Sequence, residues 1–462
     1  MGKWPEHKIY VYIALIIGVF FIFLTPPFQS PDEDSHFKKS YQVANGHFYP
    51  VAHDGKLGNY FPKQMLDYIK EKIAYRSKLD KKYSYSEMLL EQYDNMDYTK
   101  KNFQEYSTSN IIPITYIAPA SGIIFSKLVA HIFDLDMIST VYMLYFARIF
   151  SLILSVILTT IAIKKTPVMK KTFLVVALIP MCVFLNSMVS YDNVLIPLSL
   201  LSLAMILDIT YVKKKIEKKD IIVLSLIGTV LLNVKTVYFF MYLLMFGIPF
   251  KKFGLKKDKI KIALKIIGIV LLLTLIFKFP LIIQKVSSSD ANAKKQIAFV
   301  LSHPIKYMSI LLNNIEYQRL FYLNTTVGTF GLIDTYLPIS VIVFIYINIF
   351  VTALVDGSSD KIKVDKVIKI LSVVYVMICA ISIYTALYVT WTPQVFKKIG
   401  SNEITGVQGR YFLPLVMPLL LVFSNSKIKD NYFFRIVREN YLLLPILFLV
   451  LSLNIVLIRF WI

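Results

Sequence analysis

Residues 9–25 read IYVYIALIIGVFFIFLT, and the chain continues through PPFQS to Pro31-Asp32-Glu33-Asp34-Ser35-His36-Phe37. An uncharged, apolar run of this length predicts a helix that spans a membrane. Three carboxylates and an imidazole therefore follow directly where that helix leaves the bilayer. Two interpretations stand at this point: an acidic cap on the next helix, because Asp and Glu favour a first turn, or the edge of a site that faces a membrane-borne substrate.

The composition extends the membrane assignment to the whole chain. Of 462 residues 56% are hydrophobic, and the mean hydropathy is +0.60, which predicts an all-α polytopic membrane protein. The net charge of +22 comes mainly from short lysine clusters between apolar runs, a pattern that indicates membrane orientation and no nucleic-acid partner. Cys182 and Cys379 each lie inside an apolar run, so we expect no disulfide framework and no cysteine metal site.

The hydropathy pattern predicts about eleven transmembrane helices. Thr25-Pro26-Pro27 is no small-residue cleavage site, so we expect the first span to be retained. The eleven spans are placed at about residues 9–25, 140–163, 172–190, 194–211, 220–234, 236–250, 260–283, 338–355, 367–391, 411–425 and 441–459. The fifth and sixth are short and could instead form a re-entrant hairpin with Lys235 at its tip.

The parity of the spans depends on residues 111–133. This segment is apolar but contains Pro113 and Pro119, which favours a broken helix in the membrane interface over a twelfth span. If it does not cross, the lysine clusters all face the cytoplasm, as the positive-inside rule requires. These clusters are residues 164–171, 213–219, 251–257, 361–366 and Lys427 to Arg438. We therefore predict the amino terminus inside and the carboxyl terminus outside.

This topology divides the chain into five parts. They are a first transmembrane helix (1–25), an extracellular loop with interfacial helices (26–139), helices two to seven (140–283), a second extracellular loop (284–337) and helices eight to eleven (338–462). The cytoplasmic loops are short and basic, so any chemistry is expected on the outer side.

Ionisable residues gather at the predicted outer boundary. Arg148, Asp192, Lys235 and Arg410 all fall on the same side of the membrane as Asp32, whereas a transporter concentrates such groups near the midplane. Cations opposed by carboxylates suit a lipid-phosphate substrate, since cations hold phosphate and a carboxylate can activate a hydroxyl.

Each of these residues also has a structural interpretation. Arg148 could pair with Asp192 as a structural ion pair, Lys235 could extend to the lipid headgroups, and Arg410 with Tyr411 could anchor the interface.

The histidines carry less weight as site residues. His36 and His303 are more simply explained by local hydrogen bonding, and His47 and His53 lack a metal-ligand spacing with His36, so no metal site is predicted. The phosphate-binding and hydrolytic motifs of soluble enzymes are missing from the sequence.

A set of short motifs resembles a known group of proteins. In chain order these are Pro31-Asp32-Glu33 with His36-Phe37, Ser190-Tyr191-Asp192, Lys235, and Gln408-Gly409-Arg410-Tyr411 with Pro414. Together they resemble the bacterial domain-of-unknown-function family 2142, which is grouped with the GT-C superfamily of integral-membrane glycosyltransferases. The first outer loop is similar to that of protein O-mannosyltransferases. Two departures are the extra acid Asp34 and the separated Pro113 and Pro119, where the mannosyltransferases have a Pro-Pro pair.

The resemblance implies a GT-C-like bundle in a bacterial plasma membrane, with the active site on the extracellular side. The enzyme would transfer a sugar, with inversion, from a polyprenyl-phosphate donor to a cell-envelope glycan or lipid-linked acceptor. Asp32 would be the general base with Glu33 beside it, and Asp34 leaves the choice of carboxylate open. The donor phosphate would be bound by Arg148, Lys235, Gln408, Arg410 and Tyr411, with Asp34, His36, Asp192 and His303 as further site candidates.

Cofactor and alternative functions follow from the donor. A monophosphate donor needs no metal, whereas with a diphosphate donor Asp32 and Asp192 could hold Mg²⁺ or Mn²⁺. A flippase or exporter of lipid-linked oligosaccharides, acting without catalysis, is the alternative function. A third is an envelope scaffold whose first loop binds a partner.

Overall fold

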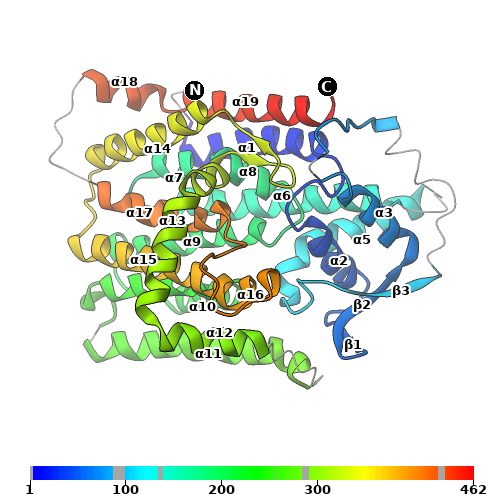
Figure 1. The fold of residues 1–462 in the computed structure, drawn as a ribbon. Helices are drawn as coiled ribbons and strands as arrows, with labels where there is room; N and C mark the ends of the chain where they lie inside the picture. Colours follow the sequence, from blue (N-terminus) through cyan, green and yellow to red (C-terminus); the bar gives the residue numbers. More distant parts are fainter. Residues whose placement is uncertain are drawn as a thin grey trace.

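The structure is a computed structural model that describes residues 4–76, 78–86, 99–133, 139–254, 256–283, 291–424 and 432–462. Long helices run side by side through most of it (Figure 1). The α-helices of the first half are α1 (Glu6–Leu24), α2 (Glu33–Ala44), α3 (Lys63–Ile73), α5 (Ile117–Ile132), α6 (Thr140–Lys165), α7 (Lys170–Ala177), α8 (Pro180–Asn186), α9 (Asp192–Tyr211) and α10 (Lys218–Val234). Those of the second half are α11 (Lys256–Ile283), α12 (Ala291–Ser302), α13 (Pro304–Val327), α14 (Ile339–Ser359), α15 (Lys366–Thr390), α16 (Thr392–Phe396), α17 (Leu413–Leu420), α18 (Tyr432–Asn440) and α19 (Leu443–Phe460). Shorter 3₁₀ helices are η1 (Pro113–Tyr116), η2 (Thr236–Gly247), η3 (Phe250–Lys252), η4 (Gly409–Phe412) and η5 (Leu421–Phe423).

Eight helices of the described part are long and apolar enough to cross a membrane, which agrees with an α-helical membrane protein. Seven of them, α1, α6, α9, α11, α14, α15 and α19, coincide with predicted spans. The other four predicted spans are shorter or interrupted: residues 172–190 break between α7 and α8, 220–234 form α10, 236–250 form η2, and 411–425 form η4, α17 and η5. The count of eleven spans and their orientation stay predictions. Lys427, which belongs to a predicted cytoplasmic cluster, lies outside the described residues.

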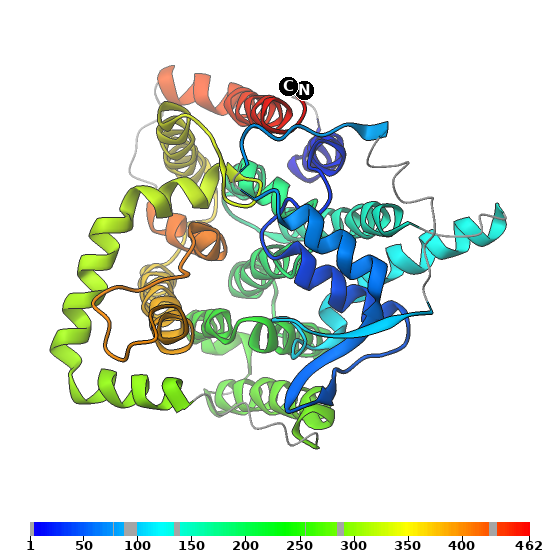
Figure 2. The ribbon, with the colours of Figure 1, turned by 45° about the vertical axis from the view of Figure 1, so that its right-hand side comes forward.

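The eighth helix is the segment expected in the interface. Residues Pro113–Ile132 have the length and hydropathy of a span. Figure 2 looks nearly along several of the long helices, and the cyan helix α5 lies across that view. The helix packs closely against α6 at Gly122, where a Cβ would lie only 2.3 Å from the backbone oxygen of Phe146. The placement of this segment in the interface therefore stays a prediction.

The first large loop contains a small antiparallel sheet that an all-α prediction misses. The strands β1 (Val51–His53), β2 (Lys56–Pro62) and β3 (Lys101–Glu105) pair in that order. Asp54 and Gly55 join the first two strands with φ values of 48° and 73°, as a two-residue hairpin turn requires. A second pair, β4 (Thr329–Phe330) with β5 (Thr335–Tyr336), lies in the loop between α13 and α14. The Asp-Gly pair was the sequence signal for the first hairpin.

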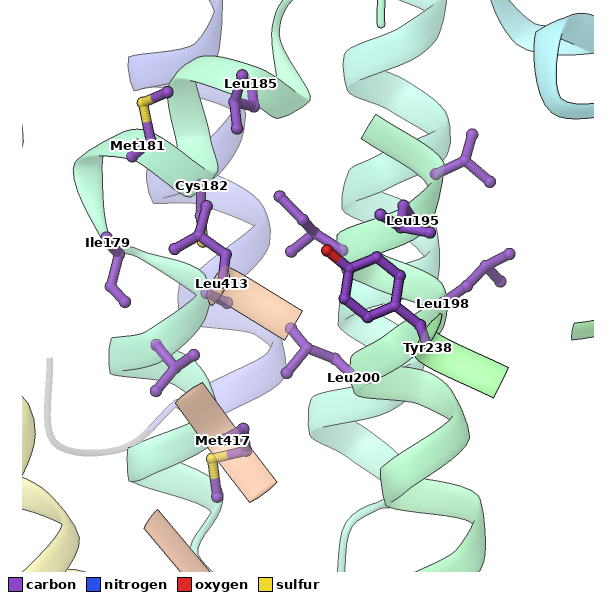
Figure 3. Close-up of a cluster of buried hydrophobic side chains, with 14 of the residues drawn as sticks. Ile179, Met181, Cys182, Leu185, Leu195, Leu198, Leu200, Tyr238, Leu413 and Met417 are labelled. Atoms are coloured by element: carbon purple, nitrogen blue, oxygen red, sulfur yellow. The ribbon is translucent and has the colours of Figure 1, made fainter. Parts of the chain in front are cut away.

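A packed core joins α8, α9, η2 and α17. Figure 3 shows Cys182 of α8, Leu195 of α9, Tyr238 of η2 and Leu413 of α17 converging on one another. The Tyr238 hydroxyl donates a 2.6 Å hydrogen bond to the backbone oxygen of Tyr411. Since apolar packing alone gives little preference for one helix arrangement within lipid, this polar contact helps to fix the segment that carries residues 409–412.

Candidate functional site

Asp32 stands at the junction of α1 and α2 in a backbone conformation that few non-glycine residues adopt. Its φ and ψ are 61° and 9°, in the left-handed region, and its backbone oxygen accepts hydrogen bonds from the amides of Ser35 (3.0 Å) and His36 (3.1 Å). Within the described residues its carboxylate makes no capping bond to α2 and instead pairs with Arg410. The acidic stretch does lie at the start of α2, as the cap interpretation expects, with Asp32 at the N-cap and Glu33 and Asp34 in the first turn, but among the described residues the Asp32 side chain makes no capping bond. Backbone strain of this kind is commonly concentrated at functional sites.

Arg410 holds together three segments that are far apart in the sequence. Its guanidinium is almost fully buried, pairs with Asp32 and Asp192 (3.3 Å to the latter), and donates from Nε to the side-chain oxygen of Gln408 at 2.7 Å. Asp192 is also nearly buried, whereas 53% of the Asp32 side-chain surface is exposed. Of the two carboxylates on Arg410, only that of Asp32 is open to a ligand.

Gly409 allows the segment that carries Arg410 to pack closely enough on α13 for the guanidinium to reach Asp32 and Asp192. The segment lies against the backbone of α13, where a Cβ at this position would meet the backbone oxygen of Tyr322 at 2.1 Å. Its amide donates to Thr325 Oγ1 (2.7 Å), and its carbonyl accepts from Thr326 Oγ1 (3.0 Å). Only glycine fits this close approach, so backbone packing requires the glycine of Gln408-Gly409-Arg410.

Lys235 supplies a second cation beside Arg410. It lies in the link between α10 and η2, with Nζ 3.3 Å from the ring centre of Tyr411 and 5.1 Å from that of Tyr191. The nitrogen is buried and has no hydrogen-bond partner within the described part of the chain. Burial lowers the pKa of Lys235 to about 7, so the amine is only partly protonated at neutral pH. An anionic ligand would favour the protonated form, whose N–H donors are unused within the described residues.

Glu33 and Arg148 form a separate, fully buried ion pair. Arg148 donates to both Glu33 oxygens (2.8 and 2.6 Å), and its other N–H groups reach the carbonyls of Ile22 (2.9 Å), Thr25 (2.6 Å) and Pro26 (3.1 Å). Neither side chain has any exposed surface. The suggested pairing of Arg148 with Asp192 is wrong, because all five guanidinium donors are used by Glu33, at the start of α2, and by the carbonyls at the end of α1.

Two further site candidates on α2, Asp34 and His36, have partners other than Arg410. Asp34 pairs with Lys38 one turn along the helix at 2.8 Å. His36 is buried, with Nδ1 2.8 Å from the Tyr116 hydroxyl and its ring edge-on to Tyr191, 4.7 Å between ring centres. His36 thus packs against the Tyr191 ring, which also contacts Lys235.

His303 is not brought to this cluster. It is exposed at the start of α13, where it bonds to the Ser302 hydroxyl (2.8 Å) and stacks on Phe299. Tyr191 and Tyr238 were not named as site residues from the sequence, although both contact named ones. The motif Ser190-Tyr191-Asp192 was a signal for the first; Tyr238 has none, since it lies in an evenly apolar run.

The electrostatics leave the site with opposed charges. Burial lowers the pKa of His36 to about 4, so its ring is neutral at pH 7. Burial would raise the pKa of Asp32, but the Arg410 guanidinium outweighs that effect and holds the pKa below its usual value. Asp32 is therefore ionised, and a poor base, for as long as Arg410 is paired with it.

The two carboxylates that could have held Mg²⁺ or Mn²⁺ are both paired with Arg410. A divalent cation between Asp32 and Asp192 would have to displace the guanidinium, so these residues do not fit a metal. Over the described ranges, no three His, Cys, Asp or Glu side chains form a metal-binding group.

The helices and this cluster define the class: an α-helical membrane protein in which ionisable side chains from four distant segments meet, all of them buried except the half-exposed Asp32. Residues 15–419 match the family described as "predicted membrane protein (DUF2142)", a domain of unknown function, and the chain belongs to that family. No curated protein and no solved structure matches the chain.

Proposed function

We propose that this protein is a GT-C-type membrane glycosyltransferase that moves a sugar from a polyprenyl-phosphate donor to a glycan or lipid-linked acceptor at the outer face of a bacterial plasma membrane. One observation carries the proposal. A half-exposed, ionised carboxylate in a strained backbone stands against a buried guanidinium, beside a lysine amine that has no hydrogen-bond partner among the described residues.

The cations suit the leaving group. As the bond between the anomeric carbon and the phosphate oxygen breaks, its electron pair passes to the phosphate, whose negative charge grows. Arg410 offers planar paired donors and Lys235 a compact charge, and both are held in place before the donor arrives. Interactions that strengthen as charge develops lower the barrier, not only the donor dissociation constant.

The carboxylate suits the acceptor. Asp32 takes the proton from the acceptor hydroxyl while that oxygen forms its bond to the anomeric carbon on the face opposite the phosphate, which inverts the configuration. Once a donor phosphate engages Arg410, it partly neutralises the positive charge that the guanidinium places beside Asp32, and the carboxylate becomes a stronger base. Donor binding therefore activates the base, and the two substrates are coupled through one ion pair.

The surrounding residues position these three groups. The Glu33–Arg148 pair ties the start of α2 to the end of α1 next to Asp32, and Gly409 sets the path of the segment that carries Arg410. In this proposal Glu33 and Arg148 are positioning residues, and neither contacts the donor.

The test uses the full-length protein in lipid nanodiscs and a panel of radiolabelled polyprenyl-phosphate sugars with envelope glycans as acceptors. Transfer by the native protein, lost in Asp32→Asn and Arg410→Ala, is the expected result. The same protein in liposomes tests the flippase alternative: a lipid-linked sugar that crosses the bilayer unchanged, equally in native protein and Asp32→Asn, contradicts the proposal.

A further inference from the structure

A second polar hollow lies some distance from the charged cluster. It has a volume of about 530 Å³ and lies between α13 and residues 396–405. The side chains that matter for its chemistry are Asn313, Glu316, Tyr317, Phe396, Asn402 and Glu403. None of the functional residues proposed above lines it.

The lining combines hydrogen-bonding groups with open aromatic rings. Asn313 and Asn402 offer amide donors and acceptors, while Glu316 and Glu403 offer acceptors alone. The Tyr317 side chain is 86% exposed, and that of Phe396 is exposed as well. Flat apolar rings beside amides and carboxylates suit a ligand with a C–H face and a rim of hydroxyl groups, which is the surface of a sugar ring.

The charges of the lining side chains restrict the class of ligand that the hollow can bind. The described residues that line it include two glutamates and no lysine or arginine, in a chain whose net charge is +22. The Arg319 guanidinium, which is not part of the lining, pairs with Glu316 at 2.5 Å. Glu403 therefore places a carboxylate in the hollow that no cation of the described lining accompanies, which disfavours phosphate, uronate and other anionic ligands.

We propose that this hollow binds uncharged or amine-bearing sugar units of a glycan. This rests on the proposed function in so far as that glycan is the acceptor, held here by units remote from its reacting end. Lipid chains are not suited to it, because the amide and carboxylate groups of its lining would lose their hydrogen bonds to water beside an acyl chain.

The path of the chain connects the hollow to the charged cluster. Asn314 Nδ2 donates to the carbonyl of Ile404 at 3.0 Å, and Thr325 Oγ1 accepts from the amide of Gly409 at 2.7 Å. Residues 404–409 therefore follow α13 over eleven helical positions, or about 17 Å at 1.5 Å per residue. An acceptor must be several sugar units long to reach from the hollow to the segment that holds Arg410.

The binding test uses the full-length protein in nanodiscs without any donor, and saturation-transfer NMR with calorimetry as the readouts. The probes are neutral hexasaccharides of glucose, galactose, mannose and N-acetylglucosamine, together with a glucosamine and a galacturonate hexamer. At least one neutral or amino hexamer is expected to bind, and the uronate at least tenfold more weakly. Failure of every neutral and amino probe, or uronate binding of equal strength, overturns the inference.

A pair of tyrosine variants locates the binding. Tyr317→Ala is expected to weaken the binding at least tenfold, while Tyr336→Ala, at an exposed tyrosine that does not line the hollow, leaves it unchanged. Equal effects of the two variants overturn the inference. Because both rings lie on the surface, neither change removes a core side chain.

Kinetics separate this inference from the proposed function. Sugar binding without any transfer contradicts the glycosyltransferase and leaves the hollow as a glycan site. If transfer occurs, Tyr317→Ala should raise the KM of a hexasaccharide acceptor about tenfold and leave that of a disaccharide unchanged. Transfer with an unaltered KM for both acceptors contradicts the hollow alone.

Discussion

The three consecutive acids Asp32, Glu33 and Asp34 give the sharpest test, because the structure assigns each a different partner. We expect amide substitutions at these positions to separate activity from stability. Asp32→Asn should abolish transfer and keep the fold, Glu33→Gln should lower the stability, and Asp34→Asn, the matched control, should change neither. Asn is the right replacement at position 32 because it tolerates the left-handed backbone found there.

The magnitudes follow from burial. Asp32 is 53% exposed and Arg410 keeps Asp192 as a partner, so losing the Asp32 charge should cost at most about 1 kcal/mol of folding free energy. Glu33 and Arg148 have no exposed surface, so Glu33→Gln leaves a buried charge unpaired, at a cost of about 3–5 kcal/mol. Loss of a general base typically lowers turnover by about 10²–10⁴-fold, equivalent to about 3–5 kcal/mol in the barrier.

The assay measures both quantities on the same preparations. Thermal unfolding in detergent reports stability, and single-turnover transfer from a polyprenyl-phosphate sugar reports the chemical step. The reasoning is refuted if Asp32→Asn keeps more than half of the native rate, or if Asp34→Asn loses as much activity. It is equally refuted if Glu33→Gln unfolds at the native temperature.

Three further predictions concern residues around this cluster. Lys235→Ala should raise the donor KM at least tenfold, because it removes the ammonium nearest Tyr411, while Lys306→Ala at an exposed lysine should not; donor titrations measure both. Gly409→Ala should abolish activity, since its Cβ would lie 2.1 Å from a backbone oxygen of α13, whereas Gly268→Ala meets nothing within 4 Å and should be silent in the same transfer assay. Burial lowers the pKa of His36 to about 4, so on acidification the unfolded chain takes up a proton at this residue before the folded protein does. The free energy of unfolding should therefore fall by about 1.4 kcal/mol per pH unit between about pH 6.5 and 4. Unfolding curves of the His36→Gln variant should lack this slope.

Hydropathy predicted the positions of the helices well, because the signal for a long apolar helix is local. The α6 helix begins at the predicted residue 140, and α11 and α15 end within a residue of their predicted limits. The small sheet was missed because its strands are short and mostly exposed, so they carry little hydrophobic alternation. Breaks such as that before Pro180 divide an apolar run without changing its mean hydropathy.

Four residues of the charged cluster were predicted from the sequence, but their pairing was not, and Arg148, Glu33, Asp34 and His303 of the predicted set pair or lie elsewhere. Arg410, Lys235, Asp192 and Asp32 were named from the sequence, and the structure brings all four together. The sequence could not assign Glu33 to Arg148, because the two are 115 positions apart and Asp192 was an equally good partner by charge. Which of two adjacent acids turns inward is decided by a backbone angle, and no composition or spacing reports that angle.

The rigidity of the cluster bears on the choice between catalysis and transport. A transporter must alternate between states, so contacts around its substrate site have to break and re-form at small cost. Here the Glu33–Arg148 pair is fully buried and uses every guanidinium donor, and breaking it would leave two unpaired charges. The Gly409 segment is likewise held on α13, because the Gly409 amide donates to the Thr325 hydroxyl and its carbonyl accepts from the Thr326 hydroxyl. Among the described ion pairs of the cluster, that of the half-exposed Asp32 carboxylate is the one whose exchange of partner costs least, and this exchange is what the proposed activation of the base by donor binding requires.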